Sequence, residues 1–180
     1  MISPSDGIVL LVVDMQNGFL GSKSHHVVAP VLNLVQQCAV LGIPTVFTRF
    51  HNEPGSLYEQ LIGWTRLRSA PETEIASDLV PFATTVIDKT IYSSFTPEFS
   101  RLAADNKWTT IAICGVATDG CVLKTAVDAF EHDLVPLVVA DACASHAGQE
   151  VHDAGLMLIS RFIGKQQIID GDEFLNKVRL

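Results

Sequence analysis

The sequence predicts an α/β protein, a three-layer αβα sandwich whose six-stranded parallel sheet has the Rossmann-like order 3-2-1-4-5-6. Three observations lead to this prediction. Short apolar runs alternate with segments of helical periodicity, which is typical of repeated βαβ units. The first apolar run, residues 8–13, has no polar alternation, as expected for a strand covered on both faces. A length of 180 residues, of which 48% are hydrophobic and 18% charged, suits a single domain over residues 1–180.

The six predicted strands are short and lie between turn residues. In chain order they are residues 8–13, 45–48, 85–88, 109–114, 137–140 and 167–169. Pro136 marks the start of the fifth strand, because proline cannot donate a hydrogen bond within a sheet. We expect the first strand to be central, with helices packed on both of its faces.

Three segments between the strands carry apolar residues at helical spacing, and we expect these stripes to be packing faces. The first helix begins near Pro30, a favoured first-turn residue, and ends at Gly42. The stripes are Val31, Leu34, Val35 and Cys38; Leu123, Ala126, Val127 and Phe130; and Val151, Gly155, Leu158, Ile159 and Phe162. Residues 52–81 do not continue this alternation of strands and helices, because they contain prolines and mixed charges. We therefore expect a long excursion over one sheet edge, of the kind that often lines ligand-binding sites.

Charge and cysteine content narrow the functional classes. The formal net charge of −8 disfavours nucleic acids and acidic membranes as partners, because both select clustered Lys and Arg. The apolar run at residues 8–13 is too short for a signal sequence or a membrane span. The cysteines, Cys38, Cys114, Cys121 and Cys143, show neither CxxC nor zinc spacing, so we expect free thiols and a cytoplasmic protein.

Three residues with reactive side chains follow the carboxyl ends of predicted strands. Asp14 follows the first strand, Lys89 the third and Cys121 the fourth. Parallel sheets bind ligands outside these ends, where the strand order reverses. In the predicted order Asp14 and Cys121 lie across one crevice, and Lys89 must reach inward over about 10 Å. Cys121 also stands in the first turn of a predicted helix, whose dipole should lower the pKa of the thiol below about 8.5.

Each of these residues also has an ordinary structural explanation. Asp14 could cap a turn, Lys89 could be solvated, and Cys121 could be a small core residue. The functional interpretation depends on their joint placement at the carboxyl ends of different strands, because chance would scatter them over both ends.

Two further motifs fit other functions less well. Gly115 and Gly120 have the glycine spacing of a phosphate-binding loop, but Cys121 and Val122 replace the required Lys and Ser/Thr. Cys143 and His146 could form a second Cys/His pair. Helix capping by Ser145 or Asp141 and packing of Cys143 explain that segment better.

Three sequence strings together resemble one superfamily. They are Val12-Val13-Asp14-Met15-Gln16-Asn17-Gly18-Phe19, Asp88-Lys89-Thr90-Ile91-Tyr92-Ser93-Ser94-Phe95 and Gly115-Val116-Ala117-Thr118-Asp119-Gly120-Cys121-Val122. From about residue 7 to residue 169 the chain resembles the isochorismatase-like cysteine hydrolases, which include nicotinamidases and N-carbamoylsarcosine amidases. The resemblance implies that Cys121 is the nucleophile, that Asp14 takes its proton and later protonates the leaving amine, and that Lys89 stabilises both.

The resemblance also implies where negative charge on the substrate oxygen would be held. The backbone N–H groups of Ala117 and Cys121 would form the oxyanion hole, with a cis peptide between Val116 and Ala117. Attack on an amide or ureido carbonyl would give a tetrahedral oxyanion and then a thioester that water hydrolyses.

The sequence departs from the metal-dependent members of this superfamily. These carry Asp-x-His after the second strand and a further His, whereas residues 48–52 here contain His51 and no aspartate. One imidazole does not make a metal site, so we expect no metal and no cofactor, and nicotinamide is disfavoured as a substrate. The remaining histidines, His25, His26, His132, His146 and His152, have no ligand spacing.

The sequence gives the least information about which residues bind the substrate. Arg49, His51, Arg66 and Arg68 are candidates for binding a substrate carboxylate, with solvated loop charges as the alternative. Phe19, Trp64 and Tyr92 are candidates for the pocket wall, with local packing as the alternative.

The function that follows is metal-independent hydrolysis of a C–N bond, amide or ureido/carbamoyl, in a small molecule. Two alternatives stay open. An isochorismatase-type enol ether hydrolase of the same superfamily does not need a cysteine, and a non-catalytic scaffold would keep only the fold. The resemblance further implies a homo-oligomer, a dimer or tetramer, for which residues 52–81 are the natural contact.

Overall fold

A computed structural model describes residues 7–179 and centres on a fully parallel sheet in the order β3-β2-β1-β4-β5-β6. The strands are β1 (Ile8–Val13), β2 (Thr45–Phe50), β3 (Val86–Lys89), β4 (Thr110–Val116), β5 (Val135–Ala144) and β6 (Ile168–Ile169). The predicted fold class and strand order are confirmed. β1 and β4 lie side by side at the point where the order reverses, so their carboxyl ends flank one crevice.

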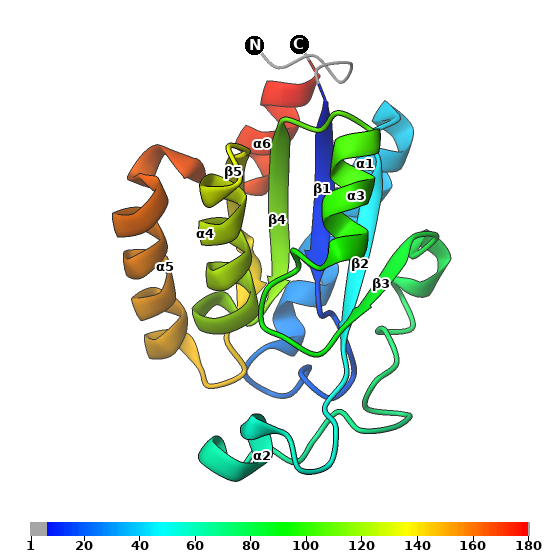
Figure 1. Ribbon diagram of the computed structural model, residues 1–180. Helices are drawn as coiled ribbons and strands as arrows, with labels where there is room; N and C mark the ends of the chain where they lie inside the picture. The colour runs from blue at the N-terminus through cyan, green and yellow to red at the C-terminus, as the bar shows by residue number, and fades with distance from the viewer. Residues whose placement is uncertain (1–6, 180) are drawn as a thin grey trace.

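Helices cover both faces of the sheet (Figure 1). In that view α3 (Pro97–Asp105), α4 (Leu123–Glu131) and α5 (Gln149–Ile163) lie in front, and α1 (Val28–Leu41) and α6 (Gly171–Val178) lie behind. The short α2 (Leu57–Ile62) stands beyond the carboxyl ends of the strands. Single helical turns occupy His25–Val27, Thr118–Val122, Val80–Phe82 and Lys165–Gln167. Within residues 7–179, no helix combines the length and apolar character that a bilayer span requires.

The element boundaries follow from local signals and from pairing with neighbours. α1 ends at Gly42, whose φ of 70° closes the helix in the left-handed region. β2 extends to Phe50, because Arg49 and Phe50 pair with the last residues of β3. β5 begins before Pro136 and continues past the predicted end at residue 140. The register shift in β4 between Ile113 and Gly115 allows the end of that strand to pair with residues 143 and 144.

The predicted packing faces of α4 and α5 are partly wrong. Phe130 is 55% exposed, Leu158 41% and Phe162 55%. The buried face of α4 consists instead of Thr125, Ala126, Asp128 and Ala129. Two of these residues are polar because they hold the loop after β3: the Thr125 hydroxyl accepts from the backbone N–H of Ser94, and Asp128 accepts from the Ser93 hydroxyl. Burying these polar partners rotates the packing face of α4 away from Phe130.

The excursion over residues 52–81 passes across the carboxyl edge of the sheet, below the strands in Figure 1. Gln16, just past β1, joins this excursion to the sheet. Its side-chain NH₂ donates to the carbonyl oxygens of Phe50 (2.9 Å) and Thr73 (3.0 Å), and its side-chain oxygen accepts from the N–H of Phe50 (2.7 Å). The excursion therefore forms a second wall beside the ends of β1, β2 and β4.

Candidate active site

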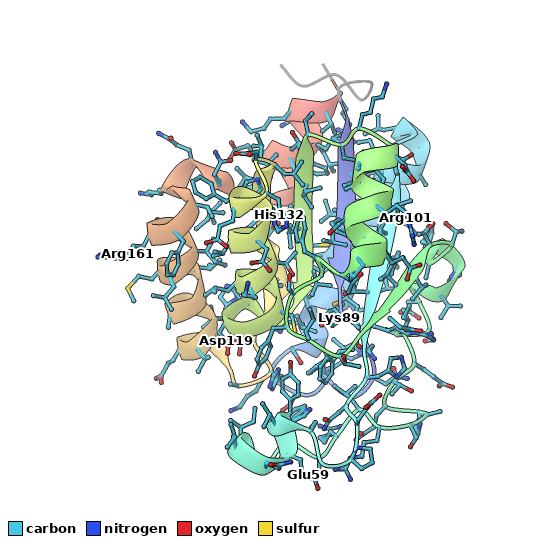
Figure 2. All side chains as sticks on the ribbon, in the orientation of Figure 1. Glu59, Lys89, Arg101, Asp119, His132 and Arg161 are labelled. Atoms are coloured by element: carbon cyan, nitrogen blue, oxygen red, sulfur yellow. The ribbon has the colours of Figure 1, made fainter. Side chains whose placement is uncertain are left out.

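Asp14, Lys89 and Cys121 meet at the carboxyl edge of the sheet. Lys89 Nζ lies 2.7 Å from Asp14 Oδ2 and 3.5 Å from Cys121 Sγ. All three residues are buried, with exposures of 0%, 3% and 5%. Figure 2 shows Lys89 at this edge, with Asp119 on the neighbouring turn that leads into α4. The long stem of Lys89 crosses the end of β2 to reach the other two residues.

The Lys89 ammonium is held by the loop that follows its own strand. Nζ donates to the carbonyl oxygens of Ile91 (3.0 Å) and Tyr92 (3.1 Å) and lies 5.4 Å from the centre of the Phe50 ring. Burial lowers the pKa of Lys89, but electrostatic interactions with Asp14 and Cys121 and hydrogen bonds to both outweigh burial and raise the pKa overall. Lys89 therefore remains a cation at neutral pH.

Asp14 is oriented by Thr48, a residue of β2 that sequence reasoning did not single out. The Thr48 hydroxyl donates to Asp14 Oδ1 at 2.7 Å and accepts from the Asp14 backbone N–H at 3.2 Å. The backbone of Asp14 has a φ of 48°, a region that Asp tolerates better than most residues. Because Oδ1 accepts a hydrogen bond from Thr48, the other carboxylate oxygen, Oδ2, faces the Lys89 ammonium. No sequence signal distinguishes Thr48, because β2 also carries the polar residues Thr45 and Arg49.

Two close approaches shape the turn that carries Cys121. Gly115 has a φ of 114°, and a Cβ at this position would lie 2.1 Å from the carbonyl oxygen of Val13, so only glycine lets β4 pass β1 here. Gly155 allows α5 to pack against the turn, because a Cβ there would lie 2.9 Å from the backbone nitrogen of Asp119. The sulfur is thus held against the end of β1 by backbone packing.

The turn itself begins at a cis peptide bond between Val116 and Ala117. Residues Thr118–Val122 then form one π-helical turn that runs directly into α4. The carbonyl oxygen of Ala117 accepts from the backbone N–H groups of Gly120 and Val122, on either side of Cys121. Cys121 therefore lies at the amino-terminal end of a continuous helical segment, as the sequence predicted.

The pKa of the Cys121 thiol shifts in the opposite direction to the sequence-based expectation. Burial raises this pKa and the Asp14 carboxylate raises it further, whereas the Lys89 cation lowers it. The two raising effects together exceed the lowering effect on the pKa, so the sulfur is a neutral thiol beside a carboxylate and an ammonium group. The helix dipole was a poor guide because the sequence does not reveal how deeply the sulfur is buried.

A cavity of about 340 Å³ opens above Cys121. Its walls are mainly aromatic: Phe19 stacks on Trp64 with ring centres 5.8 Å apart, and Tyr58 meets Tyr92 edge to face at 5.0 Å. Its size and apolar lining suit a small organic molecule. The structure thus places Phe19, Trp64 and Tyr92 in the wall, together with Tyr58 and His146, which sequence reasoning did not assign to it.

The predicted carboxylate-binding side chains lie outside this cavity lining. Arg49 donates two hydrogen bonds to Asp88, at 2.7 and 2.9 Å, and His51 lies 3.0 Å from the same carboxylate. Arg66 pairs with Glu72 at 2.8 Å, and Arg68 pairs with Glu59 at 2.6 Å. Each of these arginines is thus engaged with a carboxylate of the protein itself.

Residues 7–179 contain no cluster of three or more His, Cys, Asp or Glu side chains placed to hold a metal ion. The polar groups nearest the sulfur are instead one carboxylate and one ammonium group, already paired with each other. This arrangement places a thiol, a carboxylate and a fixed positive charge together at the floor of an apolar cavity.

Comparison with known proteins places this geometry in context. The family model described as the isochorismatase domain matches residues 9–167. The chain is 31% identical over 150 residues to the phenazine biosynthesis protein PhzD1 of Pseudomonas aeruginosa, covering 76% of this chain and 70% of that protein. It is 29% identical over 140 residues to isochorismatase domain-containing protein 2 of Bos taurus, covering 77% and 60%.

Solved structures share the fold at lower sequence identity. An isochorismatase-like hydrolase from Alkaliphilus metalliredigens superposes with a TM-score of 0.82 at 20% identity, covering 95% of this chain and 98% of that one. N-carbamoylsarcosine amidase from Thermoplasma acidophilum gives 0.80 at 24% identity, covering 92% and 97%. Nicotinamidase PncA from Bacillus subtilis gives 0.80 at 23% identity, covering 91% and 99%. With its domain match and the expected sheet order, the chain belongs to the isochorismatase-like hydrolase family.

Proposed function

We propose that this protein is a cysteine hydrolase that cleaves the C–N bond of a small amide or ureido compound through a thioester on Cys121. The observation that carries the proposal is the position of Lys89 Nζ, 2.7 Å from Asp14 and 3.5 Å from the Cys121 sulfur. The names of two structural neighbours, an N-carbamoylsarcosine amidase and a nicotinamidase, support the choice of a C–N bond.

In the first step the Asp14 carboxylate takes the proton of the Cys121 thiol, and Sγ attacks the substrate carbonyl carbon. Because burial raises the pKa of the thiol, the thiolate forms by transfer to a neighbouring base rather than by release to water. Lys89 stays charged and stabilises negative charge on either partner. The attack gives a tetrahedral intermediate whose oxygen carries a negative charge.

In the second step the intermediate collapses and the C–N bond breaks. The protonated Asp14 gives its proton to the departing nitrogen, which leaves as ammonia or an amine, and a thioester remains on Cys121. Water then loses a proton to Asp14 and attacks the thioester, and the proton returns to sulfur as the acid or carbamate product departs. The backbone N–H groups of Ala117 and Cys121 would hold the oxyanion in both steps.

A second reaction has support from the curated relatives. One protein at 31% identity is described as a probable isochorismatase, which favours cleavage of an enol ether. That reaction does not use a thiol nucleophile, so Cys121→Ala separates the two. Loss of turnover supports the C–N hydrolase, whereas retained turnover on an enol ether supports the isochorismatase.

The test of the proposed function is a panel of small amides, N-carbamoyl amino acids and ureido acids assayed for ammonia release. We expect at least one class to be hydrolysed by the wild-type protein and none by Cys121→Ala. A matched control is Cys143→Ala, which removes a buried thiol from β5 without touching Cys121. Absence of turnover on every class would favour a binding scaffold.

We also propose that the protein acts as a homo-oligomer. Apolar side chains stand exposed on two surfaces, with Leu57 (67%), Leu61 (75%) and Ile62 (62%) on α2, and Phe130 (55%), Met157 (66%) and Phe162 (55%) on α4 and α5. Exposed apolar groups of this size favour association. Sedimentation analysis tests this, and a monomer at all concentrations would contradict it.

A further inference from the structure

α5 packs against the turn that carries Cys121 through two residues on one face of the helix. A Cβ at Gly155 would lie 3.0 Å from the carbonyl carbon of Thr118, so the helix backbone is in close contact with the turn. About one helical turn earlier, His152 Nδ1 lies 2.7 Å from the Thr118 hydroxyl oxygen. Thr118 is the first residue of the turn and is fully buried. His152 thus supplies a side-chain hydrogen bond at the point where the turn begins.

The hydrogen bond between Thr118 and His152 has a preferred direction. Within residues 7–179, His152 Nδ1 is the one partner found for the Thr118 hydroxyl. If Nδ1 carried a proton and donated it, the hydroxyl proton of Thr118 would be buried without an acceptor. The hydroxyl therefore donates to the lone pair of Nδ1, and the proton of the neutral ring is on Nε2. A protonated imidazole has no such lone pair, so it cannot accept this hydrogen bond.

His152 lines a second cavity, a polar cleft of about 220 Å³. The basic and acidic side chains that other segments contribute to this cleft are Lys23, His26 and Asp141. Lys23 donates to the carbonyl oxygen of Ala147 at 2.9 Å, and Asp141 accepts from the backbone N–H of Gly171 at 2.9 Å. The lining of the cleft shares no residue with the lining of the cavity above the sulfur. Because His152 is half-buried, its ring can take up a proton from the cleft without passing through the substrate cavity.

The surroundings of His152 favour the neutral ring. Burial lowers the pKa of His152, Asp153 on the same helix raises it, His26 lowers it and Asp119 on the turn raises it. The net shift is downward from the ordinary value. The ring is therefore neutral at pH 7, able to accept from Thr118, and becomes protonated in more acidic solution.

We propose that His152 is a positioning residue whose neutral imidazole, by accepting from the Thr118 hydroxyl, holds the turn that forms the oxyanion hole. Through Thr118 the ring fixes the direction of the backbone N–H groups of Ala117 and Cys121, which act on the transition state more than on substrate binding. Protonation of the ring from the polar cleft removes the acceptor and loosens the turn, so turnover decreases in mild acid. The inference rests on the proposed C–N hydrolase function and adds a pH-dependent control of it.

Substitutions at both ends of the hydrogen bond test this role, with the best substrate from the amide and ureido panel. His152→Leu removes the acceptor and Thr118→Val removes the donor. At about pH 7.5 we expect kcat to fall about five- to tenfold in each, the worth of one neutral hydrogen bond. KM should stay near the wild-type value, because both side chains lie outside the lining of the substrate cavity. The double variant should be no slower than either single variant, because both changes remove the same hydrogen bond.

His152→Asn is the rescue variant, because its side-chain oxygen takes the place of Nδ1 but does not titrate. We expect it to retain most of the wild-type kcat at about pH 7.5. The ratio of its kcat to that of the wild type should rise about five- to tenfold as the pH falls below about 6, because only the wild type loses the acceptor.

Two further variants check that this pH dependence comes from His152. Asp153→Asn removes a negative charge that raises the pKa of His152, so the loss of turnover should begin at a lower pH than in the wild type. His132→Asn, the same change as the rescue variant but at the carboxyl end of α4, should leave the pH profile unaltered. Circular dichroism confirms folding, and His152→Asn with Asp153→Asn still tests the inference if the apolar substitutions unfold the protein.

The outcomes separate this inference from the proposed function. Wild-type kcat in His152→Leu and Thr118→Val would overturn the role of His152, and so would a His152→Asn protein as slow as His152→Leu. A kcat ratio that stays constant down to about pH 5 would overturn the pH-dependent control. In each of these cases the C–N hydrolase survives. If the wild-type protein hydrolyses no amide or ureido compound, the proposed function fails and this inference fails with it.

Discussion

Thr48 and Asp14 are joined by two hydrogen bonds across neighbouring strands. The Thr48 hydroxyl accepts from the Asp14 backbone N–H at 3.2 Å and donates to Asp14 Oδ1 at 2.7 Å. Both residues are fully buried. One hydroxyl thus fixes the backbone and the carboxylate of the proposed base, which leaves Oδ2 for the Lys89 ammonium.

The first prediction concerns this hydroxyl. Thr48→Val keeps the shape of the side chain but removes both hydrogen bonds, so the carboxylate loses its fixed orientation. We expect kcat to fall about tenfold to a hundredfold, since a hydrogen bond to a charged group is worth about 1.5–3 kcal/mol. Thr45→Val, at the start of the same strand, is the control and should retain activity. A Thr48→Val protein with wild-type kcat would show that Thr48 is not needed to orient Asp14.

The second prediction concerns Lys89. Lys89→Met keeps the length of the side chain but leaves the Asp14 carboxylate buried without its cation. We expect the free energy of unfolding to fall by about 3–5 kcal/mol and activity to drop by at least about a hundredfold. The control is Lys177→Met, which breaks a surface pair with Glu173 and should cost less than about 1 kcal/mol. Urea unfolding and the ammonia assay measure both effects. A variant that loses stability but keeps full activity would remove Lys89 from the proposed mechanism.

The third prediction concerns the thiol. Burial and then the negative charge of Asp14 raise the pKa of Cys121, while Lys89 lowers it. Asp14→Asn removes the raising charge and keeps the cation, so the pKa of Cys121 should decrease and more thiolate should be present at a given pH. We expect Cys121 in Asp14→Asn to react with iodoacetamide faster than in the wild type between pH 7 and 9, although turnover is lost. Cys121→Ser gives the background labelling, and Asp153→Asn is the exposed control. Slower labelling in Asp14→Asn would contradict the assigned charges.

The fourth prediction concerns stability at alkaline pH. Burial raises the pKa of Cys38 to about 12 and of Cys143 to about 12, and it also raises the pKa values of Cys114 and Cys121. A thiol in the unfolded chain ionises near pH 8.5. Above that pH the unfolded chain binds fewer protons than the folded protein, so the free energy of unfolding should decrease as pH rises. The contribution of the neutral thiols to the free energy of unfolding is thus fully present below about pH 8.5. It decreases as the pH rises from there toward the pKa values of the thiols in the folded protein.

Cys38→Ala provides the matched test of this pH dependence. The variant lacks one of the four buried thiols, so its loss of stability between pH 9 and 11 should be less steep by about 1 kcal/mol per pH unit. Urea unfolding under reducing conditions measures the slope. The same slope in both proteins would show that Cys38 ionises equally in the folded and unfolded states.

The sequence was sufficient to predict the fold and the edge where the site lies. Alternation of apolar runs and helical segments predicted a parallel α/β sheet, the common Rossmann-like arrangement supplied the strand order, and the ends of three strands pointed to Asp14, Lys89 and Cys121. Features that depend on neighbours in space were missed. Thr48 acts across a strand pair, and His146 joins the cavity through packing with Phe19 and Trp64.

The errors have the same origin. The direction of the Cys121 pKa shift depends on how completely the sulfur is buried, which periodicity does not reveal. Phe130 follows the helical spacing of a packing face, but Thr125 and Asp128 occupy that face because the loop after β3 needs their hydrogen bonds. Helical spacing predicted one packing face for α4. The hydrogen bonds that Thr125 and Asp128 make to the loop after β3 determine which face is buried.

The most direct test is mass spectrometry of the intact protein, quenched in acid during turnover of the best substrate from the amide and ureido panel. The account predicts a mass increase equal to the acyl or carbamoyl group, located on the peptide containing Cys121, with one equivalent of ammonia or amine released as it forms. Steady turnover with no adduct, together with full activity of Cys121→Ala, would contradict it.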